Sequence, residues 1–158
     1  MTSFLYPIVN PKSIAFFGAS NRFSAMGTNQ LNSLLDLGFE GRIYPVHPTE
    51  EPVLGLRAYR DIQELPEVPD LAVMVLPTHL VSGAMEACGK KGIRHAIVVS
   101  GGFKEIGADG AALEKKLLAV AGRYGIRFLG PNCLGGVNPH HKFNVTFLPF
   151  EGRPGWTL

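Results

Sequence analysis

The sequence is poor in cysteine, with only Cys88 and Cys133 among its 158 residues. Two cysteines placed so far apart have neither the spacing of a metal-binding cluster nor the density of a disulfide-rich secreted scaffold. Free thiols of this kind are typical of a reducing compartment. We therefore expect a cytoplasmic protein.

Long apolar stretches and dense basic runs are also missing. No apolar run approaches the roughly 18 residues that a membrane-spanning helix needs, and the N-terminus has no signal-peptide pattern. The chain has 15 Lys and Arg against 13 Asp and Glu, scattered along its length. Because phosphate backbones bind clustered basic faces, we expect no nucleic acid partner and no membrane partner.

What the sequence contains is an alternation of short apolar runs with amphipathic segments. Residues 13–17, SIAFF, end at Gly18, which is typical of a strand buried on both faces of a parallel sheet. Further strands are expected at residues 42–46, 71–76, 96–99 and 126–129, and helices at residues 27–37, 78–91 and 110–124. This alternation predicts a doubly wound α/β domain with a mostly parallel sheet that helices cover on both faces.

Residues at the ends of these segments allow narrower predictions. Pro45 lacks a donor for the ladder, so the second strand should lie at an edge or end its pairing there. Gly38 is expected to close the first helix, and Thr78 to be the N-cap of the second. A short helical turn is expected at residues 61–65, and past Asn138 the alternation fades.

Ligands of open parallel sheets bind beyond the C-terminal ends of the strands, near the point where strand order reverses. Four loops of small and polar residues follow strands here, at residues 18–22, 46–49, 76–78 and 100–103. The first leads to a helix N-terminus, where free N–H groups favour a phosphate. Ser20, Asn21 and Arg22 of that loop carry donors for anionic oxygens, and Gly18 and Gly27 permit a tight turn and a close approach. A purely structural turn is the alternative reading of this loop.

Other chemistries find less support. Residues 18–27, GASNRFSAMG, do not match G-x-G-x-x-G, and His47 stands where an NAD enzyme has an acidic residue. A fragment of an NAD(P)-dependent oxidoreductase therefore stays open only as a less favoured alternative. His140 and His141 are adjacent and rarely converge on one ion, so no metal site is expected. Cys133 has no local histidine signature, and we expect no catalytic nucleophile there.

Five segments form a set in fixed order. They are PKSIAFFGAS at 11–20, LGFEGRIYPVHP at 37–48, PDLAVMVLP at 69–77, VVSGGFKEIG at 98–107 and GIRFLGPNCLGGVNP at 125–139. Together they resemble the N-terminal CoA-binding domain of NDP-forming acyl-CoA synthetases. That family includes ADP-forming acetate-CoA ligase and is related to the succinyl-CoA synthetase α subunit.

The resemblance implies coenzyme A as the ligand and residues 1–150 as a Rossmann-like CoA-binding domain. Residues 151–158 would be the start of a following domain or a C-terminal tail. The family joins a carboxylic acid to CoA with ATP or GTP, through an acyl phosphate and a phosphohistidine. Those steps belong to a phosphohistidine domain and an ATP-grasp portion, so we do not expect this chain to catalyse alone. A stand-alone CoA-binding or regulatory module is the alternative.

The resemblance also implies which residues contact the ligand. The first loop would hold CoA phosphates, the loop around Pro48 would line the nucleotide side, and the later loops would lead toward the thiol. The implied CoA-binding residues are Gly18, Ala19, Ser20, Asn21, Arg22, Gly27, Val46, His47, Pro48, Thr49, Pro77, Ser100, Gly101 and Asn132. The family often has Asn-Pro-Lys where this chain has His47-Pro48-Thr49, so a lysine that can neutralise CoA phosphate is replaced.

Overall fold

The structure is a computed structural model that describes residues 3–49 and 51–147. The expectation for residues 151–158 lies outside this part of the chain. The strands are β1 (Ser13–Phe17), β2 (Arg42–Val46), β3 (Leu71–Met74), β4 (His95–Val98), β5 (Arg127–Leu129), β6 (Val137–Asn138) and β7 (Phe143–Asn144). The α-helices are α1 (Tyr6–Val9), α2 (Met26–Asp36), α3 (Thr78–Lys91) and α4 (Ala108–Tyr124), and the 3-10 turns are η1 (Ile62–Glu64), η2 (Lys104–Ile106) and η3 (Pro139–His141).

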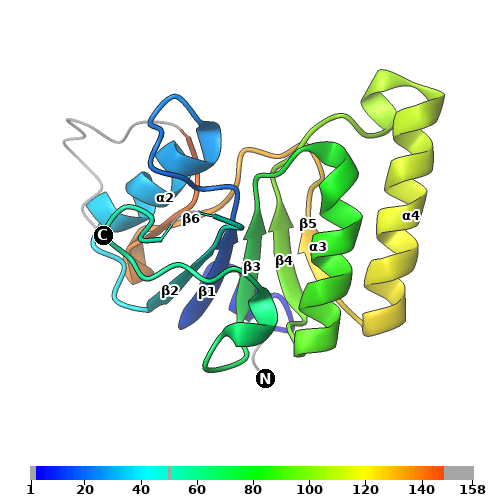
Figure 1. The fold of residues 1–158 in the computed structure, drawn as a ribbon. Helices are drawn as coiled ribbons and strands as arrows, with labels where there is room; N and C mark the ends of the chain where they lie inside the picture. The colour runs from blue at the N-terminus through cyan, green and yellow to red at the C-terminus, as the bar shows by residue number, and fades with distance from the viewer. Residues whose placement is uncertain (1–2, 50, 148–158) are drawn as a thin grey trace.

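Five strands form a parallel sheet in the order β2-β1-β3-β4-β5. The chain runs outward from β1 to β2 and then returns past β1 to begin β3, so strand order reverses between β1 and β3. This reversal opens a crevice at the C-terminal ends of these two strands, which lie along the upper edge of the sheet in Figure 1. The predicted doubly wound α/β fold is confirmed.

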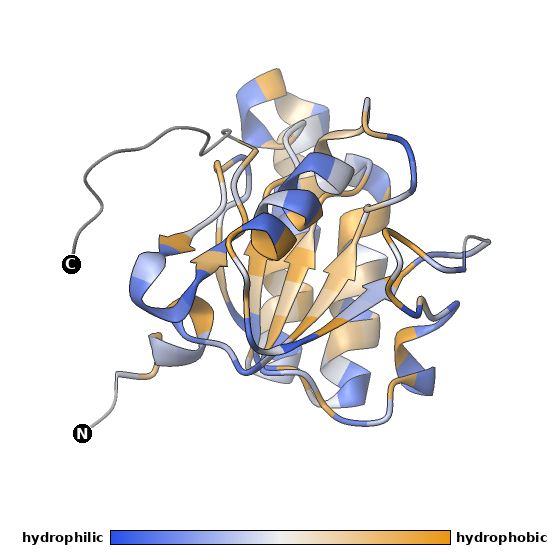
Figure 2. Cartoon of the chain, turned by 90° about the vertical axis from the view of Figure 1, so that its left-hand side faces the viewer, coloured by the Kyte–Doolittle hydropathy of each residue, from blue (hydrophilic) through white to orange (hydrophobic). Residues whose placement is uncertain are grey.

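Apolar residues of the sheet build a core on each face. Ala15, Met74 and Val98 face α3 and α4, whereas Phe16 and Val73 face α2. Figure 2 shows the apolar colours concentrated in the central strands and mixed colours on the helices around them. Burying one such large apolar side chain contributes about 1.5–3 kcal/mol, so the continuous apolar runs account for the sheet's position inside the domain.

Strand β2 lies at the edge of the sheet, as Pro45 predicted. Beyond it the backbone of Tyr59 adds two hydrogen bonds, from Tyr59 N–H to the Pro45 carbonyl and from His47 N–H to the Tyr59 carbonyl, both 2.9 Å. Pro45 therefore occupies a position where its carbonyl is used and its missing donor leaves the ladder intact.

The predicted helix closure at Gly38 and the short turn near residues 61–65 are also confirmed. Gly38 has a φ of +77° directly after the C-cap of α2, and η1 lies inside the predicted turn. Helix α4 begins two residues earlier than predicted, and α2 begins and ends one residue earlier.

The predicted end of the third strand was wrong by two residues. Strand β3 ends at Met74, and Val75 N–H still donates to the Phe17 carbonyl at 3.0 Å. The next N–H, that of Leu76, donates instead to the Ser100 hydroxyl at 2.9 Å. A side chain therefore replaces the backbone partner, and the chain leaves the ladder for the edge loops.

Thr78 is not the N-cap of α3, contrary to the prediction. Pro77 occupies that position, and Thr78 is the first residue of the helix. The Thr78 hydroxyl donates to the carbonyl of Gly101, which ties the start of α3 to the neighbouring loop.

Helix α1, strands β6 and β7, and the 3-10 turns η2 and η3 were missed. Helix α1 precedes β1, and β6 pairs antiparallel with β7 where the sequence shows no rhythm. Phe143 of β7 and Ile8 of α1 are buried in the α2-side core. In the described part of the chain, no helix is long and apolar enough to cross a membrane.

Candidate functional site

The loop after β1 packs directly against the end of β3. Gly18 has a φ of +95°, and a Cβ placed on it would lie 1.9 Å from the Val75 carbonyl oxygen. The start of α2 closes over the same loop, because a Cβ on Gly27 would lie 2.3 Å from the Gly18 carbonyl oxygen. Both glycines allow the close approach that the sequence predicted. The loop and helix start are thereby fixed at the point where strand order reverses.

Ser20 is held by Thr28, a residue that the sequence reasoning did not identify. The Thr28 hydroxyl accepts from Ser20 N–H at 3.0 Å and donates to the Ser20 carbonyl at 3.0 Å. Thr28 is fully buried in the first turn of α2. A threonine one residue after Gly27 was the available sequence signal, but its partner became evident only in the fold.

The side chains of the first loop have different surroundings. Ala19 is buried in the α2-side core, so only its backbone is available to a ligand. The Asn21 amide donates to the Pro52 carbonyl at 2.8 Å and accepts from Leu54 N–H at 2.9 Å. Asn21 therefore ties the loop after β2 to the loop after β1. The Arg22 side chain is exposed beside them.

The end of β2 lies next to this loop, because Val46 and Phe17 are partners in the parallel ladder. His47 is half-buried, and its Nδ1 accepts from Thr49 N–H at 3.2 Å. Pro48 and Thr49 are exposed. The residues predicted to line the nucleotide side thus reach the same edge as Gly18.

The four residues predicted to lead to the thiol gather around the end of β4. Ser100 accepts from Leu76 N–H through its hydroxyl and from Asn132 N–H through its carbonyl, each at 2.9 Å. A Cβ on Gly101 would lie 3.2 Å from the Asn132 side-chain oxygen. Pro77 precedes Thr78, whose hydroxyl bonds to Gly101. The loops after β3, β4 and β5 therefore form one connected cluster.

Of the helices that follow the strand ends, α2 and α3 begin with neither a side-chain cap nor an acidic residue in the first turn. The N-cap positions of α2 and α3, Ala25 and Pro77, make no side-chain cap hydrogen bond, and neither first turn contains an acidic residue. Uncapped N–H groups and the positive end of the helix dipole favour an anion. Two such N-termini beside the reversal point fit a ligand that carries several phosphates.

Glu105 is a second residue that the sequence reasoning missed. Its Oε1 accepts from Gly102 N–H at 2.5 Å and from Phe103 N–H at 3.1 Å. Hydrogen bonds from its own N–H and that of Phe103 are the main reasons why the pKa of this carboxyl lies below its usual range. Glu105 is therefore an ionised carboxylate bound to the loop that contains Ser100 and Gly101.

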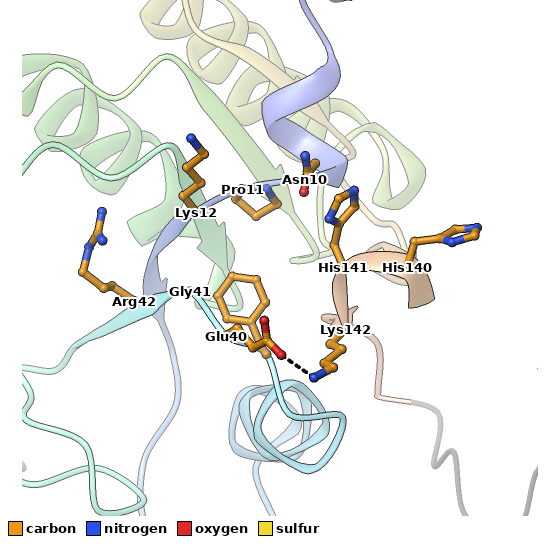
Figure 3. A pocket seen from close by; sticks show the side chains of 10 residues that line it. Asn10, Pro11, Lys12, Glu40, Gly41, Arg42, His140, His141 and Lys142 are labelled. Atoms are coloured by element: carbon orange, nitrogen blue, oxygen red, sulfur yellow. Dashed lines mark hydrogen bonds and ion pairs between the residues drawn. The ribbon is translucent and has the colours of Figure 1, made fainter. Parts of the chain in front are cut away.

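Cys133 lies against the backbone of β4, and His140 and His141 lie on η3. Burial raises the pKa of the Cys133 thiol, which donates to the Val98 carbonyl at 3.4 Å. His140 and His141 point in different directions in Figure 3. Within residues 3–49 and 51–147, no group of three or more His, Cys, Asp and Glu could hold a metal ion.

A cavity of about 320 Å³ lies at the opposite edge of the sheet, near the N-terminal ends of β1 and β2 (Figure 3). Two of its three Lys and Arg side chains have acidic partners: Lys142 pairs with Glu40, and Arg42 pairs with Glu67. The strand ends and uncapped helices lie at the other edge. The edge at the strand ends, and not this cavity, is therefore the candidate ligand site.

The fold and this edge define a class: a doubly wound α/β domain with a candidate ligand site at the reversal point between β1 and β3. The family described as "CoA binding domain" matches residues 12–139. The chain belongs to this family, as its motifs predicted, and coenzyme A is the ligand that membership assigns to the domain.

The relatives of this chain are acyl-CoA ligases. It is 42% identical over 146 residues to the ADP-forming acetate-CoA ligase I of Archaeoglobus fulgidus, covering 90% of this chain and 21% of that protein. It is 38% identical to the α subunit of acetate-CoA ligase I of Pyrococcus furiosus, covering 96% and 34%. The dinucleotide-forming acetyl-coenzyme A synthetase 1 of Ca. Korarchaeum cryptofilum superimposes with a TM-score of 0.88 at 39% identity, over 92% of this chain and 31% of that one. The chain thus spans only about a fifth to a third of these relatives.

Proposed function

We propose that this chain is the CoA-binding part of an NDP-forming acyl-CoA synthetase that joins a carboxylic acid to CoA with ATP or GTP. Its role is to hold the nucleotide and pantetheine of CoA along the upper edge of the sheet. Residues 1–150 constitute this domain, and residues 151–158 begin the next domain or form a tail. The names of the relatives and the match of their CoA-binding region support this assignment.

The observation that carries the proposal is the convergence of all five strand ends on one edge with two uncapped helix N-termini. Loop 18–22 and the start of α2 offer N–H groups and Arg22 to the CoA phosphates. The cluster of Ser100, Gly101 and Asn132 lies on the other side of the reversal point and suits the thiol end. CoA is long enough to need both parts of such an edge.

The remaining steps belong to partners. The proposed synthetase carries the phosphohistidine and the ATP-grasp portion in other domains or in another subunit, so the acyl phosphate forms outside this chain. The partial coverage of the ligase relatives supports this division. A reducing cytoplasm is the proposed location, in keeping with the free Cys88 and Cys133.

Thermal unfolding with and without ligand tests the proposal. CoA at 100 times its dissociation constant should stabilise the chain by about 2.7 kcal/mol, which raises the Tm of a domain of this size by roughly 5–10 °C. NADH at the same concentration should leave the Tm unchanged, because the loop after β1 lacks the dinucleotide fingerprint. No shift at millimolar CoA, or a larger shift with NADH, would overturn the assignment.

A stand-alone CoA-binding module is the second candidate, because the described residues supply their own core. Both faces of the sheet have their own buried cores within residues 3–49 and 51–147. The two candidates differ in what a longer gene product would contain. Sequencing the transcript that encodes the chain decides between them: a continuation with a histidine-bearing domain supports the synthetase, and a stop codon after Leu158 supports the module.

A further inference from the structure

The loop of residues 100–102, which the proposed function assigns to the thiol end of CoA, contains two consecutive glycines. Gly102 has a φ of +89°, a conformation that glycine adopts without strain. Such a segment has many accessible conformations in isolation, and ordering it when ligand binds would reduce the affinity. The structure must therefore contain something that orders this loop before CoA arrives.

Gly102 packs against Thr78, but the hydrogen bonds from neighbouring elements reach only the first half of the loop. Ser100 is bonded to Leu76 and to Asn132, and the Gly101 carbonyl accepts from the Thr78 hydroxyl. All of these bonds hold Ser100 or the oxygen of Gly101. The N–H of Gly102, which sets the direction of the second half, is held by the Glu105 carboxylate at 2.5 Å.

Glu105 also defines the surface of the loop. A Cβ on Gly101 would lie 3.4 Å from Glu105 Oε1 and 3.2 Å from the Asn132 oxygen, so these two side chains flank Gly101. The same Glu105 oxygen accepts from Phe103 N–H at 3.1 Å, and Phe103 is fully buried in the core. The carboxylate thereby connects the diglycine to the buried Phe103.

We propose that Glu105 is a positioning residue for coenzyme A, holding loop 100–102 in the conformation that receives the thiol end of the ligand. This inference rests on the proposed function. Glu105 itself need not touch CoA, since it acts through the Gly102 and Phe103 N–H groups. Glu105 therefore contributes to the affinity for the pantetheine and thiol of CoA, and not to the affinity for the nucleotide.

Binding of two ligands to the chain tests this proposal. Wild type and Glu105→Ala are titrated calorimetrically with CoA and with adenosine 3′,5′-bisphosphate, which has the nucleotide end without the pantetheine. We expect E105A to weaken CoA binding about tenfold because the loop must be ordered on binding, and to leave the affinity for the bisphosphate unchanged. Glu105→Gln keeps a side-chain oxygen at the Oε1 position and should restore most of the CoA affinity, to within about threefold of wild type.

Glu114→Ala is the matched control. Glu114 lies on α4, accepts from Lys104 N–H at 3.2 Å and pairs with the Lys104 ammonium at 3.5 Å. It therefore contacts the residue that follows Phe103 and does not contact the Gly102 N–H. E114A should lower the stability of the segment. It should not weaken binding of CoA more than binding of adenosine 3′,5′-bisphosphate. A selective loss of CoA affinity in E114A as large as that in E105A would overturn the proposal.

Three other results have equally definite meanings. Wild-type CoA affinity in a folded E105A, or an equal loss for both ligands, would overturn the positioning role while leaving the proposed function in place. If E105A does not fold, E105Q decides the matter: a small loss confined to CoA supports the role, and an equal loss for both ligands contradicts it. A wild-type chain that binds neither ligand overturns the proposed function, and the inference with it.

Discussion

At Gly18 the backbone passes too close to β3 for any side chain, and this single contact fixes where the loop after β1 begins. The left-handed φ of Gly18 disfavours a residue with a Cβ, and the nearby Val75 carbonyl leaves no space for one. The loop conformation at the reversal point therefore depends on one hydrogen atom in place of a methyl group.

Replacing Gly18 by alanine should lower the free energy of unfolding by about 3 kcal/mol, through strain and a backbone clash. Gly83→Ala is the control, because a Cβ at this position in α3 would meet nothing within 4 Å. That change should raise the free energy of unfolding by up to about 1 kcal/mol, since alanine favours the helix. Urea denaturation measures both values, and a Gly18→Ala chain as stable as wild type would refute the strain argument.

Arg22 is the exposed cation of the first loop, and its proposed role is to contact CoA phosphate. Arg22→Ala should weaken CoA binding about tenfold or more, as expected for one lost hydrogen bond between charged groups. Arg123→Ala removes the same charge from the last turn of α4, next to Glu86, and should leave CoA affinity unchanged. Isothermal titration at constant ionic strength makes the comparison. Equal losses in the two variants would mean that net charge, and not position, matters.

Single residues were predictable from the sequence where their role depends on their neighbours in the chain. Gly18 and Gly27 were identified because a glycine after a strand, or at a helix start, has a local meaning. Thr28 and Glu105 were missed because each contacts its partner only once the loop has folded. The partner of Thr28 is Ser20, and that of Glu105 is the Gly102 N–H. The contacts of the predicted ligand residues with CoA itself stay a prediction.

At the scale of elements, the strands with continuous apolar runs were predicted within one or two residues, because both of their faces are buried. The hairpin of β6 and β7 was missed, since two-residue strands are too short to show a period. Thr78 was misassigned for the opposite reason. Its residue type suits an N-cap, but the helix already includes Thr78, and its hydroxyl donates to the Gly101 carbonyl of the neighbouring loop.

The edge strand β2 is tied to the segment before β3 by an ionic cluster. Glu67 accepts from the Arg42 guanidinium at 2.5 and 2.9 Å and from the Tyr44 hydroxyl at 2.7 Å. The hydrogen bond from Arg42 is the main reason why the pKa of Glu67 lies below its usual range. Because folding lowers this pKa, the cluster stabilises the fold at neutral pH and loses its effect as the pH falls through the folded-state pKa.

Glu67→Gln should therefore cost less than about 1 kcal/mol at pH 7, since the pair is partly exposed and screened by solvent. The difference from wild type should disappear as the pH falls below the ordinary range of a glutamate. Urea denaturation of both chains across this pH range gives the test. A difference that stays constant down to pH 3 would show that the Glu67 charge is not responsible.

At the scale of the whole molecule, the two edges of the sheet have different chemistry. The upper edge combines the reversal point, two uncapped helices and the Ser100 cluster, whereas the opposite edge has a cavity in which Arg42 and Lys142 are paired with carboxylates. The fold class was predictable because it follows from the order of apolar runs. The location of the cavity was not, because it arises where segments 10–12, 39–42 and 140–142 meet in space.

The most direct test of the account is amide chemical-shift mapping of the chain during titration with CoA. The account predicts that the largest shifts occur at residues 18–22, 46–49, 100–102 and 132, and that residues 10–12, 39–42 and 140–142 stay unshifted. Shifts concentrated in the second set, or no shifts at saturating CoA, would contradict it.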